Sequence, residues 1–309
     1  MARIRRSWQN AAIVAEHKGC FALTVDRFRI FHYFKYTIYA LLMVNVYVFF
    51  SEEWAALSHR FADGLAPGDI IEAFAASIDT AAWVVLLLMF ELETFVLTDE
   101  HTSKRTTVTL HVLRAFCYIV IVYAFFGYLT KLLFLLGAGP LPGITDLCSL
   151  ASDQWAYTID LDEYEAITAA NCAGFSDASI FYQLSGLQAV VDQSGLTDIT
   201  RLAWVDVINA GVWLLVVLLL EIDVRLQEHD KFEGLALRFS NLAKYVLYSI
   251  LLLAAIYWGI KGDFVDFWDA FLWLVAFAFI ELNVFEWRQE TLEEDAAATA
   301  AGAIHPHHS

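Results

Sequence analysis

Basic residues are scarce in this sequence. Its 309 residues include 19 lysines and arginines against 36 aspartates and glutamates, so the formal net charge is −17 at pH 7. An acidic chain repels the phosphates of nucleic acid, which binding proteins neutralise with lysine and arginine. We therefore expect no nucleic-acid partner.

The common motifs of catalysis and nucleotide binding are also missing. The sequence contains no GxSxG, HExxH, P-loop or GxGxxG pattern, and no nucleophile and base are spaced as in a known catalytic motif. It has neither the TVGYG filter of potassium channels nor the arginine ladder of voltage sensors. The sequence thus gives no support for an enzyme, and it predicts no cofactor and no metal centre.

Apolar residues, by contrast, are abundant. They make up 59% of the chain, whereas soluble domains contain roughly 45–50%. Six apolar runs are each close to the about 20 residues that span a bilayer as a helix. These predicted spans are residues 30–50, 80–98, 110–136, 204–222, 243–260 and 267–285. We expect an all-α polytopic protein of the lipid bilayer with six transmembrane helices.

The uneven distribution of the basic residues predicts the orientation. Fifteen of the 19 lie on the side of the N-terminus and four lie on the other side. Because cytoplasmic loops are enriched in lysine and arginine, both termini are expected in the cytoplasm, with the chain in a bacterial-type inner (plasma) membrane. The outer side carries 19 of the 36 acids, so it would attract cations or a basic protein. An acidic surface that only serves solubility is the alternative.

A two-helix unit occurs three times in the chain. Three predicted helices align without gaps as DTAAWVVLLLMFELETF, NAGVWLLVVLLLEIDVR and DAFLWLVAFAFIELNVF, beginning at residues 79, 209 and 269. In each helix that precedes them, a cation is followed four residues later by a tyrosine. Repeats with an even number of spans keep one orientation and are related by an axis along the membrane normal. We expect three parallel hairpins in a pseudo-threefold arrangement.

These repeats divide the chain into segments. The segments are a cytoplasmic amphipathic N-terminus (1–29), three hairpin repeats (30–98, 110–228 and 243–288) and a flexible cytoplasmic tail (289–309). The second hairpin includes an outer loop at 137–203, which is too long to lack structure, and we expect it to form a small helical cap. Cys148 and Cys172 both lie in this loop, and in an oxidising compartment they are expected to form a disulfide.

Charged residues interrupt the hairpins at the depth of the hydrocarbon. Asp79 and Glu91 are about 18 Å apart along a helix, so they cannot lie at opposite surfaces of a hydrocarbon layer of about 30 Å. The candidate ion-binding or relay residues are Glu91, Glu93, Glu221, Asp223 and Glu281, with Asp79 and Asp269 toward the outer side. Their candidate charge partners are Lys35, Arg114 and Lys244.

The five inner carboxylates exceed these three cations by two charges. Protons, a bound cation or water must compensate for the surplus. Rings of acids select cations, and chains of acids relay protons. The sequence therefore predicts a channel or transporter for small cations or protons. The alternative is that the ion pairs only join the helices, in a non-catalytic accessory or scaffold subunit whose acidic outer face docks a partner.

Overall fold

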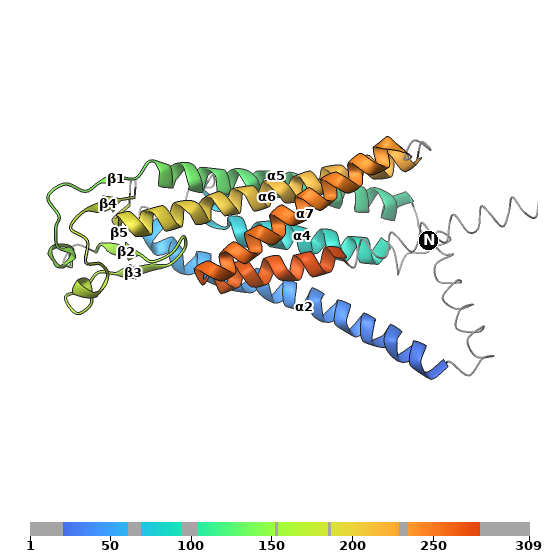
Figure 1. Ribbon diagram of the computed structural model, residues 1–309, viewed down its shortest axis with the longest axis horizontal. Coiled ribbons are helices and arrows are strands. Elements are labelled where there is room, and N and C mark those ends of the chain that lie inside the picture. Colours follow the sequence, from blue (N-terminus) through green and yellow to red (C-terminus); the bar gives the residue numbers. More distant parts are fainter. Residues whose placement is uncertain are drawn as a thin grey trace, which may run out of the picture.

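The computed structural model describes residues 21–60, 69–93, 104–151, 154–184, 187–228 and 234–278. They form a long helical bundle with a small sheet-containing cap at one end (Figure 1). We call this the cap end. Most of the predicted N-terminal segment, 1–29, and all of the predicted tail, 289–309, lie outside the described residues.

The bundle is built from helices that no proline interrupts. It comprises α2 (Phe21–Arg60), α3 (Ile70–Ala73), α4 (Ala75–Glu91), α5 (Lys104–Leu136), α6 (Gln193–Glu228), α7 (Leu235–Lys261) and a helix at 264–278. All four prolines of the chain lie outside these helices, so every helical backbone keeps its N–H donors. Helix α4 packs against α2 and α5, and α6 packs against α5 and α7.

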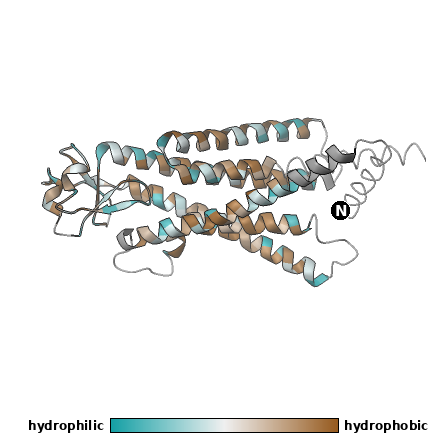
Figure 2. Cartoon of the chain, turned by 90° about the horizontal axis from the view of Figure 1, so that it is seen from below, coloured by the Kyte–Doolittle hydropathy of each residue, from teal (hydrophilic) through white to brown (hydrophobic). Residues whose placement is uncertain are grey.

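Four of the described helices are long and apolar enough to cross a membrane. They contain the candidate spans His32–Leu57, Lys104–Leu136, Gln193–Asp223 and Leu235–Lys261. Apolar residues dominate the bundle, and hydrophilic residues become frequent toward the cap (Figure 2). Helix α4 has 17 residues, about 26 Å of helix, and the 264–278 helix reaches the end of the described residues. The count of six spans therefore stays a prediction.

The cap contains a β-sheet where the sequence predicted short helices. Its strands are β1 (Gly139–Pro140), β2 (Ala156–Thr158), β3 (Tyr164–Ala166), β4 (Phe181–Gln183) and β5 (Ala189–Asp192), in the order β1-β4-β5-β2-β3. Strands β2 and β5 are parallel, and the other neighbours are antiparallel. Between these strands, the described helical turns are the 3-10 helices η3 (Leu147–Leu150) and η4 (Cys172–Gly174). Strands of two to four residues are too short to display an alternating pattern.

The predicted disulfide between Cys148 and Cys172 is confirmed, and it joins η3 to η4. Beside it lies a small apolar core, in which Tyr157 of β2 stacks on Phe175 with ring centroids 4.9 Å apart. Phe181 of β4 is 1% exposed in the same core. The cap thus has its own interior next to the helical bundle.

Two glycines fix how the helices meet near the cap end. A Cβ atom at Gly127 of α5 would lie 3.1 Å from the backbone oxygen of Ile71 and 3.2 Å from Cβ of Ala75, so glycine permits the close approach of α5 to α3 and α4. Gly262 ends α7 with φ 92°, a left-handed conformation that favours glycine. The chain therefore turns directly from α7 into the 264–278 helix.

Candidate functional site

The end of the bundle opposite the cap contains a buried ion pair. Lys35 Nζ of α2 lies 2.6 Å from Glu91 Oε1 of α4, and the lysine side chain is completely buried. The hydroxyls of Tyr36 and Tyr39 donate to the same carboxylate over 3.1 and 3.4 Å. The structure thus brings together one cation and one acid of the first hairpin.

The other two helix cations pair with the second acid of the preceding hairpin. Arg114 Nη2 of α5 lies 2.5 Å from Glu93 Oε2. Lys244 Nζ of α7 lies 3.1 Å from Asp223 Oδ2 of α6, which also accepts a hydrogen bond of 2.5 Å from Ser240 Oγ. These two pairs therefore join successive hairpins rather than the two helices of one hairpin.

The remaining inner carboxylates are Glu221 and Glu281. Glu221 is half exposed, and its Oε1 lies 3.0 Å from Arg225 Nη2 on the next turn of α6. Glu281 lies outside the described residues. Each inner carboxylate that the structure describes therefore has a cationic partner, which reduces the charge surplus expected at this end.

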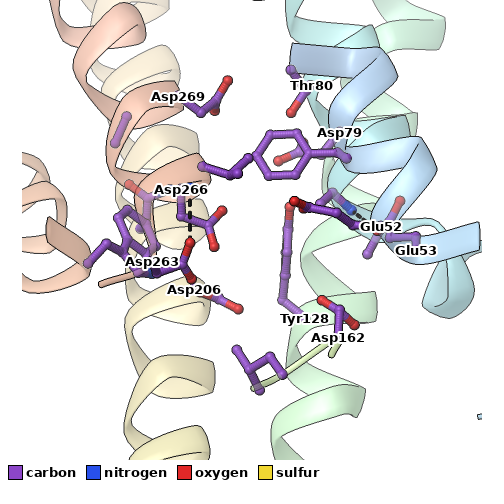
Figure 3. Close-up of a pocket in the computed structure, with 18 of the residues that line it drawn as sticks. Glu52, Glu53, Asp79, Thr80, Tyr128, Asp162, Asp206, Asp263, Asp266 and Asp269 are labelled. Carbon is purple, nitrogen blue, oxygen red and sulfur yellow. Dashed lines mark hydrogen bonds between the residues drawn. The ribbon is translucent and has the colours of Figure 1, made fainter. Parts of the chain in front are cut away.

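An acidic cavity of about 570 Å³ lies at the cap end, between the helices and the β2–β3 loop (Figure 3). Among the described residues, ten carboxylate side chains line the cavity, together with one basic side chain, that of Lys131. The ten are Glu52, Glu53, Asp79, Asp160, Asp162, Glu163, Asp206, Asp263, Asp266 and Asp269. Two of the candidate residues from the sequence, Asp79 and Asp269, thus line one cavity, although 190 positions separate them.

Two of these carboxylates cap helices. Glu53 of α2 accepts hydrogen bonds from the backbone N–H groups of Ala76 and Ser77, over 2.7 and 3.2 Å, and from Ser77 Oγ over 2.6 Å. Asp263 Oδ1 accepts the backbone N–H of Asp266 over 3.2 Å at the start of the 264–278 helix. First-turn N–H groups have no partner within their helix, so these acids have a structural role.

Two further acids are held by polar side chains of other elements. Asn45 Nδ2 of α2 donates to Asp269 Oδ1 over 2.9 Å. Lys131 Nζ, near the end of α5, lies 2.6 Å from Asp162 Oδ2 in the β2–β3 loop. The second contact ties the loop of the cap to the helical wall of the cavity.

Among the described residues, three buried oxygens of the cavity lining have no hydrogen-bond partner. They are the Oδ1 atoms of Asp79 on α4 and of Asp206 and Asn209 on α6. Leaving such an atom unpaired is unfavourable by about 1–3 kcal/mol, and buried polar atoms without partners are rare in folded proteins. Donor groups of a bound molecule inside the cavity would supply the missing hydrogen bonds.

The three aligned tryptophans meet at one side of this cavity. The ring centroid of Trp83 lies 6.1 Å from that of Trp213 and 6.2 Å from that of Trp273. Phe277 packs among them, 4.5 Å from Trp213. We call these four residues the aromatic layer. Because Trp83 lies one turn beyond Asp79 in the direction of Glu91, the layer separates the acidic cavity from the ion pairs.

The chain has no match among protein-family models, curated proteins or solved structures. Within the described ranges, no three or more histidine, cysteine, aspartate or glutamate side chains are grouped closely enough to hold a metal ion. The ten carboxylates are spread over the walls instead of converging on one point.

Glu52, Asp206 and Asp266 also line the cavity, although none of them is among the site residues predicted from the sequence. A signal for two of them was present in the repeats. Asp206 precedes the aligned Asn209 by three residues, and Asp266 precedes the aligned Asp269 by the same interval. Residues three apart lie on one helix face, so each acid had to point the same way as its aligned neighbour. Glu52 has no such partner in the sequence.

Asp160 illustrates the crowding of negative charge at the mouth of the cavity. Burial raises the pKa of Asp160 above its ordinary value of 3.8, and the carboxylates of Asp263 and Asp162 raise it further. Two contacts lower the pKa of Asp160. The backbone N–H of Leu161 donates to Asp160 Oδ1 over 2.8 Å, and the positive charge of Lys131 favours the ionised carboxylate. A cation in the cavity would favour the ionised carboxylate, so cation binding would release protons.

Proposed function

We propose that this chain is an integral membrane protein that admits small cations or protons to the acidic cavity and transports them toward the opposite face. The observation that carries the proposal is the lining of the cavity, with ten carboxylates and one lysine. Asp79 and Asp206 line this cavity from two helices, and each has one buried oxygen that no described residue pairs with. A cleft lined by one sign of charge concentrates the opposite ion, and rings of acids select cations.

Transport requires a route from the cavity past the aromatic layer. Apolar constrictions gate channels by excluding water, and the four packed rings of the aromatic layer suit such a gate. Beyond it, the proposed relay residues are Glu91, Glu93, Glu221, Asp223 and Glu281. Lys35, Arg114 and Lys244 would set the charge of this second group of acids, and movement of the ion pairs would open the route.

The proposed architecture is six spans in three hairpins about a pseudo-threefold axis. The meeting of Trp83, Trp213 and Trp273, which occupy the same position of the three repeats, supports it. We further propose that the cap faces outward from a bacterial-type inner membrane and that both termini are cytoplasmic. The disulfide in the cap supports this orientation, since disulfides persist in oxidising compartments.

The proposed transport is tested with purified protein in liposomes. Sodium, potassium, calcium and proton flux are each measured with ion-sensitive dyes. The double variant Asp79→Asn/Asp206→Asn should lower the flux of the transported ion at least tenfold, because it removes two carboxylates of the cavity that each have one buried oxygen without a partner among the described residues. Asp177→Asn, in an exposed part of the cap and outside the cavity lining, is the matched control. No flux in the wild-type protein for any of these ions would refute the proposal.

A scaffold subunit is the second candidate, and one specific observation favours it. Glu91, Glu93 and Asp223 all form ion pairs between helices, which is the arrangement expected when inner charges only join the bundle. The acidic β2–β3 loop would then dock a basic protein. Under this alternative the wild-type protein conducts no ion, and charge-reversing changes at Glu163 release a partner that co-purifies from the native membrane.

A further inference from the structure

We propose that the ligand of the acidic cavity is an organic diammonium ion, a short alkyl chain with a charged amine at each end. This inference rests on the proposed function of the cavity as a cation site, and it names the chemical class of the cation. Three features of the cavity lead to it: its size, the placement of its acids and its aromatic side.

The size of the cavity exceeds what a single metal ion needs. Its about 570 Å³ falls within the roughly 300–1,000 Å³ of small-molecule sites, whereas one water molecule occupies about 30 Å³. Calcium requires about six to eight oxygens at roughly 2.3–2.6 Å, and no three acids in the described part of the chain are grouped for such a site. The space and the ligand geometry both favour a polyatomic cation.

Seven of the ten acids lie on two walls that face each other across the cavity, and the other three belong to the β2–β3 loop (Figure 3). One wall carries Asp206 of α6, Asp263 before the 264–278 helix, and Asp266 and Asp269 within that helix. The other wall carries Glu52, Glu53 and Asp79, from α2 and α4. In the part of the chain that the structure describes, each wall has a buried oxygen without a partner, Asp206 Oδ1 on the first wall and Asp79 Oδ1 on the second. A monovalent ion can pair with one wall at a time, whereas a diammonium ion can donate hydrogen bonds to both.

The aromatic layer gives the alkyl chain of such a ligand a place to pack. Trp83, Trp213, Trp273 and Phe277 line the same cavity as the acids. Tryptophan rings attract an ammonium group that lies within about 6 Å of the ring centroid, and their faces also pack against methylene groups. A hydrated metal ion gains neither contact. The combination of acids on two walls and indole rings at one side of the same cavity therefore favours an organic amine.

A series of matched ligands tests this inference on the wild-type protein. Full-length protein in lipid nanodiscs is titrated calorimetrically with 1,4-diaminobutane, butylamine, 1,4-butanediol and calcium chloride at constant ionic strength. We expect the diamine to bind at least tenfold more tightly than butylamine, and the diol not to bind. Equal affinities for diamine and monoamine, or tighter binding of calcium than of the diamine, would overturn the inference.

Variants of each wall add a second test. Asp79→Asn and Asp206→Asn should each reduce the preference for diamine over monoamine from at least tenfold toward equal affinity, because each removes from one wall the carboxylate whose buried oxygen has no partner among the described residues. Asp177→Asn should keep the wild-type preference. An unchanged preference in both wall variants would contradict the two-wall site. The ligand series on the wild type decides the question even if a wall variant does not fold.

Flux and binding separate this inference from the proposed function. Diamine binding by a protein that conducts no ion supports the ligand class and refutes transport. Sodium or proton flux by a protein that binds butylamine and the diamine equally supports transport and overturns the ligand class.

Discussion

Lys35 Nζ lies 2.6 Å from Glu91 Oε1, and the lysine side chain has no exposed surface. The pair joins α2 to α4 within the apolar bundle, where its carboxylate also accepts hydrogen bonds from Tyr36 and Tyr39. Removing one member of a buried pair leaves the other charge uncompensated. The stability of the bundle should therefore depend on both residues together.

Replacing Lys35 with methionine is expected to destabilise the protein by about 3–5 kcal/mol, because Glu91 would remain as a buried unpaired charge. The double variant Lys35→Met/Glu91→Gln should recover most of this loss. Unfolding in detergent, followed by circular dichroism, measures the effect. As a control, Arg225→Met removes the exposed partner of Glu221 and should lower stability by less than about 1 kcal/mol. If the double variant is less stable than Lys35→Met alone, the two residues do not stabilise the bundle as a pair.

The disulfide should stabilise the cap and leave the helical bundle unaffected. Cys148 and Cys172 are 24 residues apart, and closing a loop of this length contributes about 3.5 kcal/mol in the chain-entropy account. Replacing both with serine is expected to speed amide hydrogen exchange in β2, β4 and β5. Exchange in α5 and α6 should stay at the wild-type rate. Cys117→Ser, in the bundle core, is the control, and faster exchange of the cap in that variant would show that the effect is not local.

Hydropathy predicted the position of the membrane helices because an apolar run of about 20 residues is long enough to cross the hydrocarbon and is unusual in soluble domains. It did not predict how far each helix extends. Helix α2 runs to Arg60, ten residues past its predicted span, since the residues around Glu53 are polar without breaking the helix. The sheet of the cap escaped prediction because its pairs, such as Ala156 with Ala189, join segments far apart in sequence.

The repeats predicted part of the cavity. Asp79 and Asp269 stood out because they begin aligned segments of the repeats, and the structure places both on the same cavity. The sequence contained no sign that Asn45 binds Asp269, because 224 residues separate them. Charge partners were likewise ambiguous. A cation and an acid at equal depth can pair within one hairpin, as Lys35 does with Glu91, or between hairpins, as Arg114 does with Glu93. Which of the two pairings forms depends on how the helices pack.

Asp192 should make the junction between the cap and α6 sensitive to acid. Burial alone would raise the pKa of Asp192, but hydrogen bonds from the N–H of Gly195 and the hydroxyls of Ser176 and Ser194 outweigh it, so the pKa lies below 3.8. A lowered pKa contributes stability above pH 3.8 that is lost as the pH falls through the lowered value.

Replacing Asp192 with alanine should therefore destabilise the start of α6 by about 0.5–2 kcal/mol at neutral pH, as expected for a lost N-cap. The difference from the wild-type protein should shrink as the pH falls below 3.8. Hydrogen exchange of the first turns of α6, measured at several pH values, checks this. A difference that grows with acidity would contradict the assigned direction of the pKa shift.

Cation binding in the cavity should weaken with acidity at a higher pH than ordinary aspartates would produce. Burial raises the pKa of Asp160 above 3.8, so its proton competes with the cation over a range where an exposed aspartate is already ionised. Folding stability changes in the opposite sense, because a raised acid pKa means that the folded state holds the proton more tightly and gains stability as the pH falls.

The two trends are measured together on wild-type protein and on Asp160→Asn. Titration with 1,4-diaminobutane between about pH 4 and pH 7, where amines stay protonated, should show falling affinity toward acid pH and release of protons on binding. Asp160→Asn should bind more weakly at neutral pH and release fewer protons, since one titrating group is gone. Calorimetry in two buffers with different ionisation enthalpies counts the released protons. An affinity that is independent of pH across this range would mean that the carboxylates of the cavity do not hold the ligand.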